Sequence, residues 1–115
     1  ALEVMERQPR QGEGVRTAYR YWESLEELLK SQEQITDPLM RLQLFRDALF
    51  HIAFLAKDLE KAGIGSDQIR EASARITAEA KATEAGDAPK VLLEGLLKEI
   101  GEGKTAADRA AEDLE

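Results

Sequence analysis

Between Pro38 and Ala62 the chain carries more apolar residues than one buried face of a helix requires. At about 100° per residue, one set forms a continuous apolar stripe. That stripe consists of Leu42, Phe45, Leu49, Ile52, Ala56 and Leu59. Phe50 and Phe54 lie one turn apart outside it. A fold built on this helix therefore has to bury the stripe, and it has to bury the two extra rings as well or leave them as a second apolar surface.

The two extra rings lie among polar and charged residues, namely Gln43, Asp47, Asp58 and Lys61. Phenylalanines on a charged face require a cover, which is either another segment of this chain or a second molecule. The first alternative makes the helix the centre of the fold, and the second makes it an interface. The sequence leaves both alternatives open.

Three further segments have the periodicity of amphipathic helices. Residues 15–31 carry aliphatic and aromatic residues at helical spacing, and 66–85 carry a narrow stripe of isoleucines and small residues. The fourth segment, 88–100, has a strong apolar face of Leu92, Leu93, Leu96, Leu97 and Ile100. Asp37 and Pro38 supply a capping side chain and a proline for the start of the central helix. No segment alternates as a strand would. The sequence therefore predicts an all-α fold, an antiparallel helical bundle of four main helices.

Both ends of the chain are predicted to differ from the bundle. Residues 1–14 contain a proline and two glycines, and we expect them to form a flexible N-terminal lead-in. Residues 15–103 are predicted to form the bundle domain. Gly101 and Gly103 are expected to end the fourth helix, so that 104–115 form a short C-terminal fifth helix or a frayed tail.

Composition narrows the classes of function. A chain of 115 residues fits one domain, and the absence of cysteine excludes disulfides, thiolate metal sites and cysteine nucleophiles. It also favours a reducing compartment, and we expect a cytoplasmic protein. A formal net charge of -7 opposes binding to nucleic-acid phosphates or to anionic lipid. No apolar run is long enough to span a membrane. We therefore expect neither a nucleic-acid nor a membrane partner.

Gly103, Lys104 and Thr105 resemble the end of a phosphate-binding loop. That motif requires a glycine five residues before Gly103, where this chain has Lys98, and it requires a preceding strand. The pattern therefore favours a glycine that ends one helix, followed by a residue that caps the next.

His51 is the single histidine of the chain, and Asp47 precedes it by one helical turn. Such a pair can orient an imidazole for acid–base chemistry or bind a metal ion. One imidazole and one carboxylate are too few ligands for a metal site. The expected state is a boundary histidine that is hydrogen-bonded to the aspartate.

Arg46 and His51 have the Arg-x4-His spacing, which resembles the signature of HEPN-type helical ribonucleases. The resemblance covers six residues, and it implies cleavage of RNA by an arginine and a histidine that face a phosphodiester. On an ideal helix the two side chains diverge by about 140°. Joint action would therefore require a local bend or a dimer that brings two copies together.

Residues 45–56, followed by a glycine and a new helix, resemble the second metal-binding helix of the MazG-type all-α nucleotide pyrophosphatases. That family uses four carboxylates, in two pairs, to bind magnesium against a triphosphate. Glu23 and Glu26 fit the first pair, and Asp47 fits the last position. Leu44 occupies the third position and cannot coordinate a cation. The resemblance therefore implies a nucleotide pyrophosphatase fold with a degenerate metal site.

These patterns favour a binding protein over an enzyme. We expect a small protein–protein interaction module, such as an adaptor, assembly factor or inhibitor, that self-associates as a homodimer through the surplus apolar face of the helix 38–62. The expected interface consists of Phe50, Phe54, His51, Tyr19 and Met40. No catalytic or metal-binding residue is assigned, and no cofactor is expected. The MazG-like and HEPN-type functions remain as alternatives.

Overall fold

A computed structural model describes the backbone of residues 2–115 and the side chains from Gly14 onward. Four helices follow one another along the chain: α1 (Leu2–Ser31), α2 (Pro38–Lys61), α3 (Ser66–Ala82) and α4 (Lys90–Asp113). A short 3-10 helix, η1 (Gln32–Gln34), follows α1. The described residues contain no strand. The predicted all-α bundle of four main helices is therefore confirmed.

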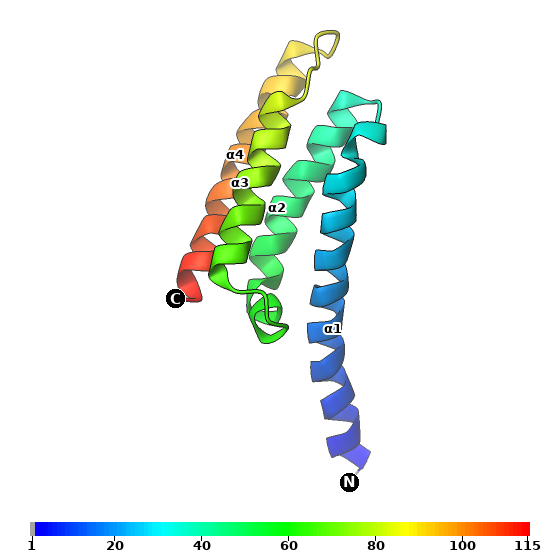
Figure 1. The fold of residues 1–115 in the computed structure, drawn as a ribbon, viewed down its shortest axis with the longest axis vertical. Coiled ribbons are helices and arrows are strands. Elements are labelled where there is room, and N and C mark those ends of the chain that lie inside the picture. Colours follow the sequence, from blue (N-terminus) through cyan, green and yellow to red (C-terminus); the bar gives the residue numbers. More distant parts are fainter. Residues whose placement is uncertain (1) are drawn as a thin grey trace.

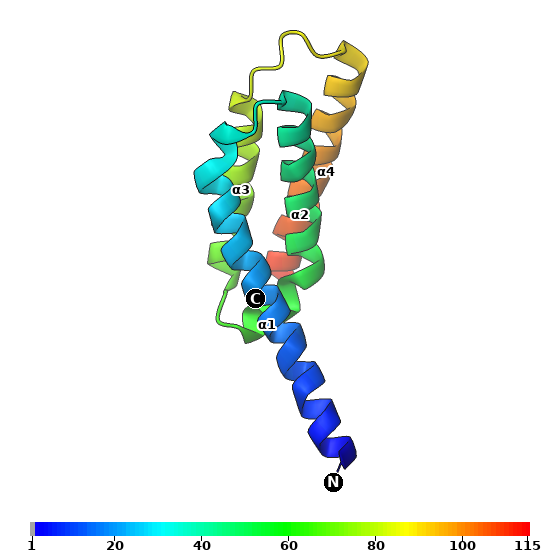
Figure 2. The ribbon, with the colours of Figure 1, turned by 90° about the vertical axis from the view of Figure 1, so that its right-hand side faces the viewer.

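The helices alternate in direction, so α1 and α3 run one way while α2 and α4 run the other (Figure 1). Helix α2 contacts each of the other three, and its most extensive packing is with α4, which is parallel to it. The remaining large contact joins α3 to α4. Helix α1 packs mainly on α2 and extends beyond the end of the bundle (Figure 2). Helix α2 is therefore the centre of the fold.

Local signals in the sequence set the bounds of α2. The Asp37 carboxylate accepts a hydrogen bond from the backbone N–H of Leu39 at 3.0 Å, and Pro38 occupies the first turn. At the other end Gly63 has φ +95°, a conformation that side chains with a Cβ rarely adopt. This turn allows the Ile64 N–H to donate to the Leu59 carbonyl at 2.9 Å, which closes the helix and starts the turn toward α3.

The apolar stripe predicted for α2 is buried in full. It packs against α1, α3 and α4, and none of its residues is more than 3% exposed, from Leu42 and Phe45 through Leu49, Ile52 and Ala56 to Leu59. Helix α1 contributes Ala18, Trp22, Leu25 and Leu29 to the same core. One cluster of buried side chains therefore holds all four helices together.

The first helix begins earlier than the sequence predicted. We expected it to start at Val15, whereas its backbone is helical from Leu2 and continues through Pro9. Adding residues to an established helix costs less than nucleating a new one, which favours this extension. Of the expected lead-in 1–14, Ala1 lies outside the described residues, and only Gly14 has a described side-chain environment.

The expected end of the fourth helix at Gly101 and Gly103 is wrong. Helix α4 continues through both glycines to Asp113, so residues 104–115 do not form a separate fifth helix. Gly103 is buried against α2, where an added Cβ would lie 2.9 Å from the Leu49 Cβ. This glycine permits the close approach of α4 to α2.

The buried face of α4 continues from Leu96 and Ile100 into small residues. Small residues at helical spacing, Gly103, Ala107 and Ala111, lie at the contact and are buried. Two leucines expected in the core, Leu92 and Leu97, are exposed instead. The C-terminal half of α4 therefore packs closely through small residues, and its first half leaves large side chains in solvent.

Candidate functional site

One side of α2 remains uncovered between α1 and α4. We call this side the outer face of α2, and it comprises Asp47, Phe50, His51, Phe54, Lys57, Asp58 and Lys61. These residues occupy the arc of the helix opposite the buried stripe. All except Asp58, which is partly covered, are exposed. The outer face therefore contains both phenylalanines that the sequence placed outside the core.

The two rings differ in how far they enter solvent. Phe54 is 86% exposed, whereas Phe50 is 41% exposed because its ring leans toward α4. A Cβ added to Gly103 would lie 3.3 Å from Cε2 of Phe50. Phe50, Phe54, Asp47 and His51 line an open, shallow depression. The outer face therefore presents an apolar centre with polar edges.

His51 lies on the α1 side of this depression. Its Nδ1 is 2.8 Å from the backbone carbonyl oxygen of Asp47, and its ring centroid is 5.3 Å from that of Tyr21 on α1. A carbonyl oxygen only accepts hydrogen bonds, so this contact requires the proton on Nδ1. The expected bond from His51 to the aspartate therefore goes to the Asp47 backbone and not to its carboxylate.

The carboxylate of Asp47 contacts an arginine instead. Arg46 places its Nε 3.1 Å from Asp47 Oδ1 and one terminal nitrogen 2.6 Å from Glu99 Oε2 on α4. The hydrogen bond to Glu99 is the main cause that raises the pKa of Arg46. One guanidinium thus serves two carboxylates, so this end of the outer face has an excess negative charge.

Tyr21 of α1 lies beside His51, with its ring centroid 5.3 Å from that of the imidazole. Burial between α1 and α2, and secondarily the negative charge of Asp47, raise the pKa of Tyr21 to about 12. Its hydroxyl therefore stays protonated at neutral pH.

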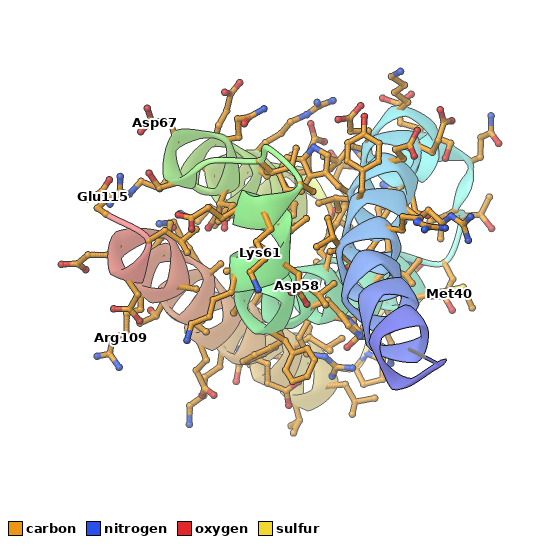
Figure 3. The ribbon with its side chains drawn as sticks, turned by 90° about the horizontal axis from the view of Figure 1, so that it is seen from below. Met40, Asp58, Lys61, Asp67, Arg109 and Glu115 are labelled. Atoms are coloured by element: carbon orange, nitrogen blue, oxygen red, sulfur yellow. The ribbon has the colours of Figure 1, made fainter. Side chains whose placement is uncertain are left out.

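The structure separates Tyr19 and Met40 from the two rings. Tyr19 is 46% exposed and lies about 200° around α1 from Tyr21, which faces His51. Met40, 53% exposed, is at the start of α2, about 15 Å along the helix from Phe50. In Figure 3 it lies well apart from Asp58 and Lys61. Of the five expected interface residues, Phe50, Phe54 and His51 are neighbours.

The residues of the two family resemblances are also separated. Arg46 turns toward Glu99 on α4, whereas His51 turns toward Tyr21 on α1. Glu26 lines a groove between α1 and α3, away from Asp47 on the outer face. Among the described residues, no group of three or more His, Asp or Glu side chains could hold a metal ion. Among the described residues of one copy, neither a metal-binding group of carboxylates nor the Arg46–His51 pair is assembled.

The segment that resembles a phosphate-binding loop is helical. The Lys104 ammonium lies 2.6 Å from Asp108 Oδ2, and the Thr105 hydroxyl donates to the Gly101 carbonyl at 3.1 Å. Both contacts are made between residues of α4, so Lys104 and Thr105 bind partners within their own helix and do not form a phosphate-binding loop. The expected cap at Thr105 is likewise absent.

Sequence reasoning did not find the groove between α1 and α3. It has a volume of about 230 Å³, with Trp22 and Ala72 on its apolar floor and Glu26, Glu71 and Arg75 on its rim. Ligand pockets commonly enclose about 300–1,000 Å³, so this groove is smaller than that class. The sequence contained one indication of this groove: Ala72 is one of the small residues of α3, and small residues bury little area and leave space beside the neighbouring helix.

None of the described helices combines the length and the apolar character needed to cross a membrane. Comparisons of this chain with known protein families, with curated proteins and with solved structures give no match.

Proposed function

We propose that this chain is a protein–protein interaction module that binds another protein chain through the outer face of α2. The observation that carries the proposal is Phe54, which is 86% exposed in the middle of the helix that forms the centre of the fold. A large ring in solvent loses the free energy that its burial would supply, about 1.5–3 kcal/mol. Association would recover that energy.

The surroundings of Phe54 support the same proposal. Phe50 adds a second, partly exposed ring one turn away, and Asp47 and His51 border the rings. An aromatic centre with a polar rim is the composition typical of protein interfaces. The cytoplasmic location expected from the cysteine-free composition is part of this proposal.

A photo-crosslinking amino acid tests the proposal when it replaces Phe54. The matched control replaces Val91, which is 82% exposed on α4 and outside the outer face. We expect position 54 to form covalent adducts with a protein chain and position 91 to form none. In each variant, circular dichroism checks that the helices are intact. Equal or absent adducts from the two positions, with both variants folded, would contradict the proposal.

A double substitution provides the second test. Phe50→Ser with Phe54→Ser should abolish the association that the crosslinks report, and it should leave helicity and cooperative melting in place, because neither ring belongs to the buried cluster. If the double variant unfolds instead, the rings stabilise the monomer and the outer face is not a binding surface.

A further inference from the structure

Three residues of the outer face follow one another at intervals of seven residues, or one heptad: Asp47, Phe54 and Lys61. Seven residues complete almost two turns of an α-helix, so successive members are displaced by only about 20°. The three side chains therefore form a straight strip about 21 Å long, with a carboxylate at one end, an exposed ring in the middle and an ammonium at the other end.

The two ends of this strip have opposite local charge. Asp47 is 52% exposed and shares Arg46 with Glu99, which leaves net negative charge there. Lys61 is exposed, and among the side chains described from Gly14 onward it forms no ion pair. Asp58 lies one turn before Lys61 on α2. Its carboxylate lies between α2 and α1 (Figure 3), because Oδ2 of Asp58 would be 3.8 Å from a Cβ added to Gly14 of α1.

We propose that the partner of the outer face is a second copy of this chain, docked with its α2 antiparallel to the first. A twofold axis at Phe54 would stack the two exposed rings. It would also place Asp47 of each copy beside Lys61 of the other, because both residues are seven positions from the axis. This inference rests on the proposed function and names its partner.

The charge pattern selects this orientation over the parallel one. With the two α2 helices parallel, Asp47 would face Asp47 and Lys61 would face Lys61, so both contacts would be repulsive. The antiparallel arrangement makes both contacts attractive. The overall charge of -7 on each copy opposes association at long range, and salt screens that repulsion over about 8 Å at 0.15 M.

The strip alone buries less area than a stable dimer interface, which covers about 800 Å² on each partner. Phe50 and the flanks of α1 and α4 beside the outer face therefore have to contribute area, and Tyr21 is the α1 residue placed beside His51. We expect association at the weak, micromolar end of the range that interfaces of this size cover, so light scattering should span about 1–500 µM protein.

Charge reversal tests the orientation. Lys61→Asp turns two attractions into repulsions, so we expect the dimer to weaken by about tenfold or more. Asp47→Lys should have the same effect, and the swapped variant Asp47→Lys with Lys61→Asp should restore the dimer. The matched control is Lys81→Asp, because Lys81 is also an exposed lysine in the last turn of a helix. It should leave the mass unchanged.

Because the chain has no cysteine, disulfide trapping gives an independent measure of the orientation. Under mild oxidation, a mixture of the variants Asp47→Cys and Lys61→Cys should form the mixed disulfide between positions 47 and 61. Each variant alone should form much less of its own symmetric disulfide. Symmetric 47–47 and 61–61 disulfides as the main products would indicate parallel docking and overturn the proposal.

The remaining outcomes separate this inference from the proposed function. A wild-type chain that stays monomeric across the concentration series overturns the second copy as partner, while crosslinks from position 54 to a different protein would leave the proposed function standing. A dimer that resists Lys61→Asp but is lost on Phe50→Ser with Phe54→Ser overturns only the antiparallel register. A dimer that resists all of these variants overturns the second copy as partner of the outer face, and if position 54 also forms no adducts the proposed function is overturned with it.

Discussion

Phe45 and Phe54 are the same residue on the same helix, yet Phe45 has no exposed surface and Phe54 is 86% exposed. Phe45 lies on the side of α2 that α1, α3 and α4 enclose, and Phe54 lies on the outer face between α1 and α4. Hydrophobicity is identical at the two positions, so only the arrangement of the neighbouring helices distinguishes them. The comparison shows that the central position of a helix in a bundle does not guarantee that its whole circumference is covered.

The comparison is tested most strongly by truncating each ring. Phe45→Ala removes a fully buried ring and should lower the free energy of unfolding by about 3–5 kcal/mol. Phe54→Ala should change it by no more than about 0.5 kcal/mol, because the ring has few intramolecular contacts to lose. Urea denaturation followed by circular dichroism measures both, at a protein concentration below that of any self-association. A comparable loss in the two variants would mean that the monomer covers Phe54.

The boundary between the two sides of α2 is tested at Gly103. A Cβ there would lie 2.9 Å from the Leu49 Cβ on the buried side and 3.3 Å from Phe50 on the outer face. Gly103→Ala should therefore push α4 away from α2 and lower stability by about 1–3 kcal/mol. The control Gly101→Ala meets no atom within 4 Å and should stabilise the helix by about 1 kcal/mol. Equal effects in thermal melts would contradict the close approach.

Tyr21 tests the α1 edge of the outer face, and its expected effect is confined to alkaline pH. Its pKa is raised to about 12, so the folded state favours the protonated phenol. The corresponding stabilisation is present below pH 10, the ordinary pKa of tyrosine, and is lost as the pH rises from about 10 to 12. Absorbance titration at alkaline pH should show one late phenol that Tyr21→Phe removes. Asp47→Asn should lower this pKa slightly, since burial is its larger cause. A late phenol that persists in Tyr21→Phe would contradict the assignment.

The sequence predicted the four-helix class and the buried stripe of α2, because both depend on periodicity and on local caps such as Asp37 and Gly63. It also placed Phe50 and Phe54 outside that stripe. It did not predict that α4 continues through Gly101 and Gly103, because glycine is the usual residue just after a helix end. The close approach of Leu49 across the interface explains why a glycine stands at position 103 within the helix.

Neighbouring helices also decide the details of the candidate site. Periodicity does not reveal which helix faces which, so the sequence could not predict that Tyr21 lies beside His51 while Tyr19 does not. The bond from Arg46 to Glu99 joins residues of two different helices and depends on their parallel alignment. The heptad from Asp47 through Phe54 to Lys61 was present in the sequence, but its exposure became known only once the positions of α1 and α4 were known.

The parallel packing of α2 and α4 has a consequence for how the chain folds. The most extensive helix contact joins α2 and α4, which are not consecutive. The chain between them, which consists of α3 and its two connections, therefore has to close into a loop before this contact forms. The consecutive pair α2 and α3 cannot bury the stripe of α2 without α4. Folding of this bundle should therefore be slower than that of a bundle in which consecutive helices share the largest contacts, and any partly folded species that lacks docked α4 would expose the Leu49 side chain that Gly103 approaches.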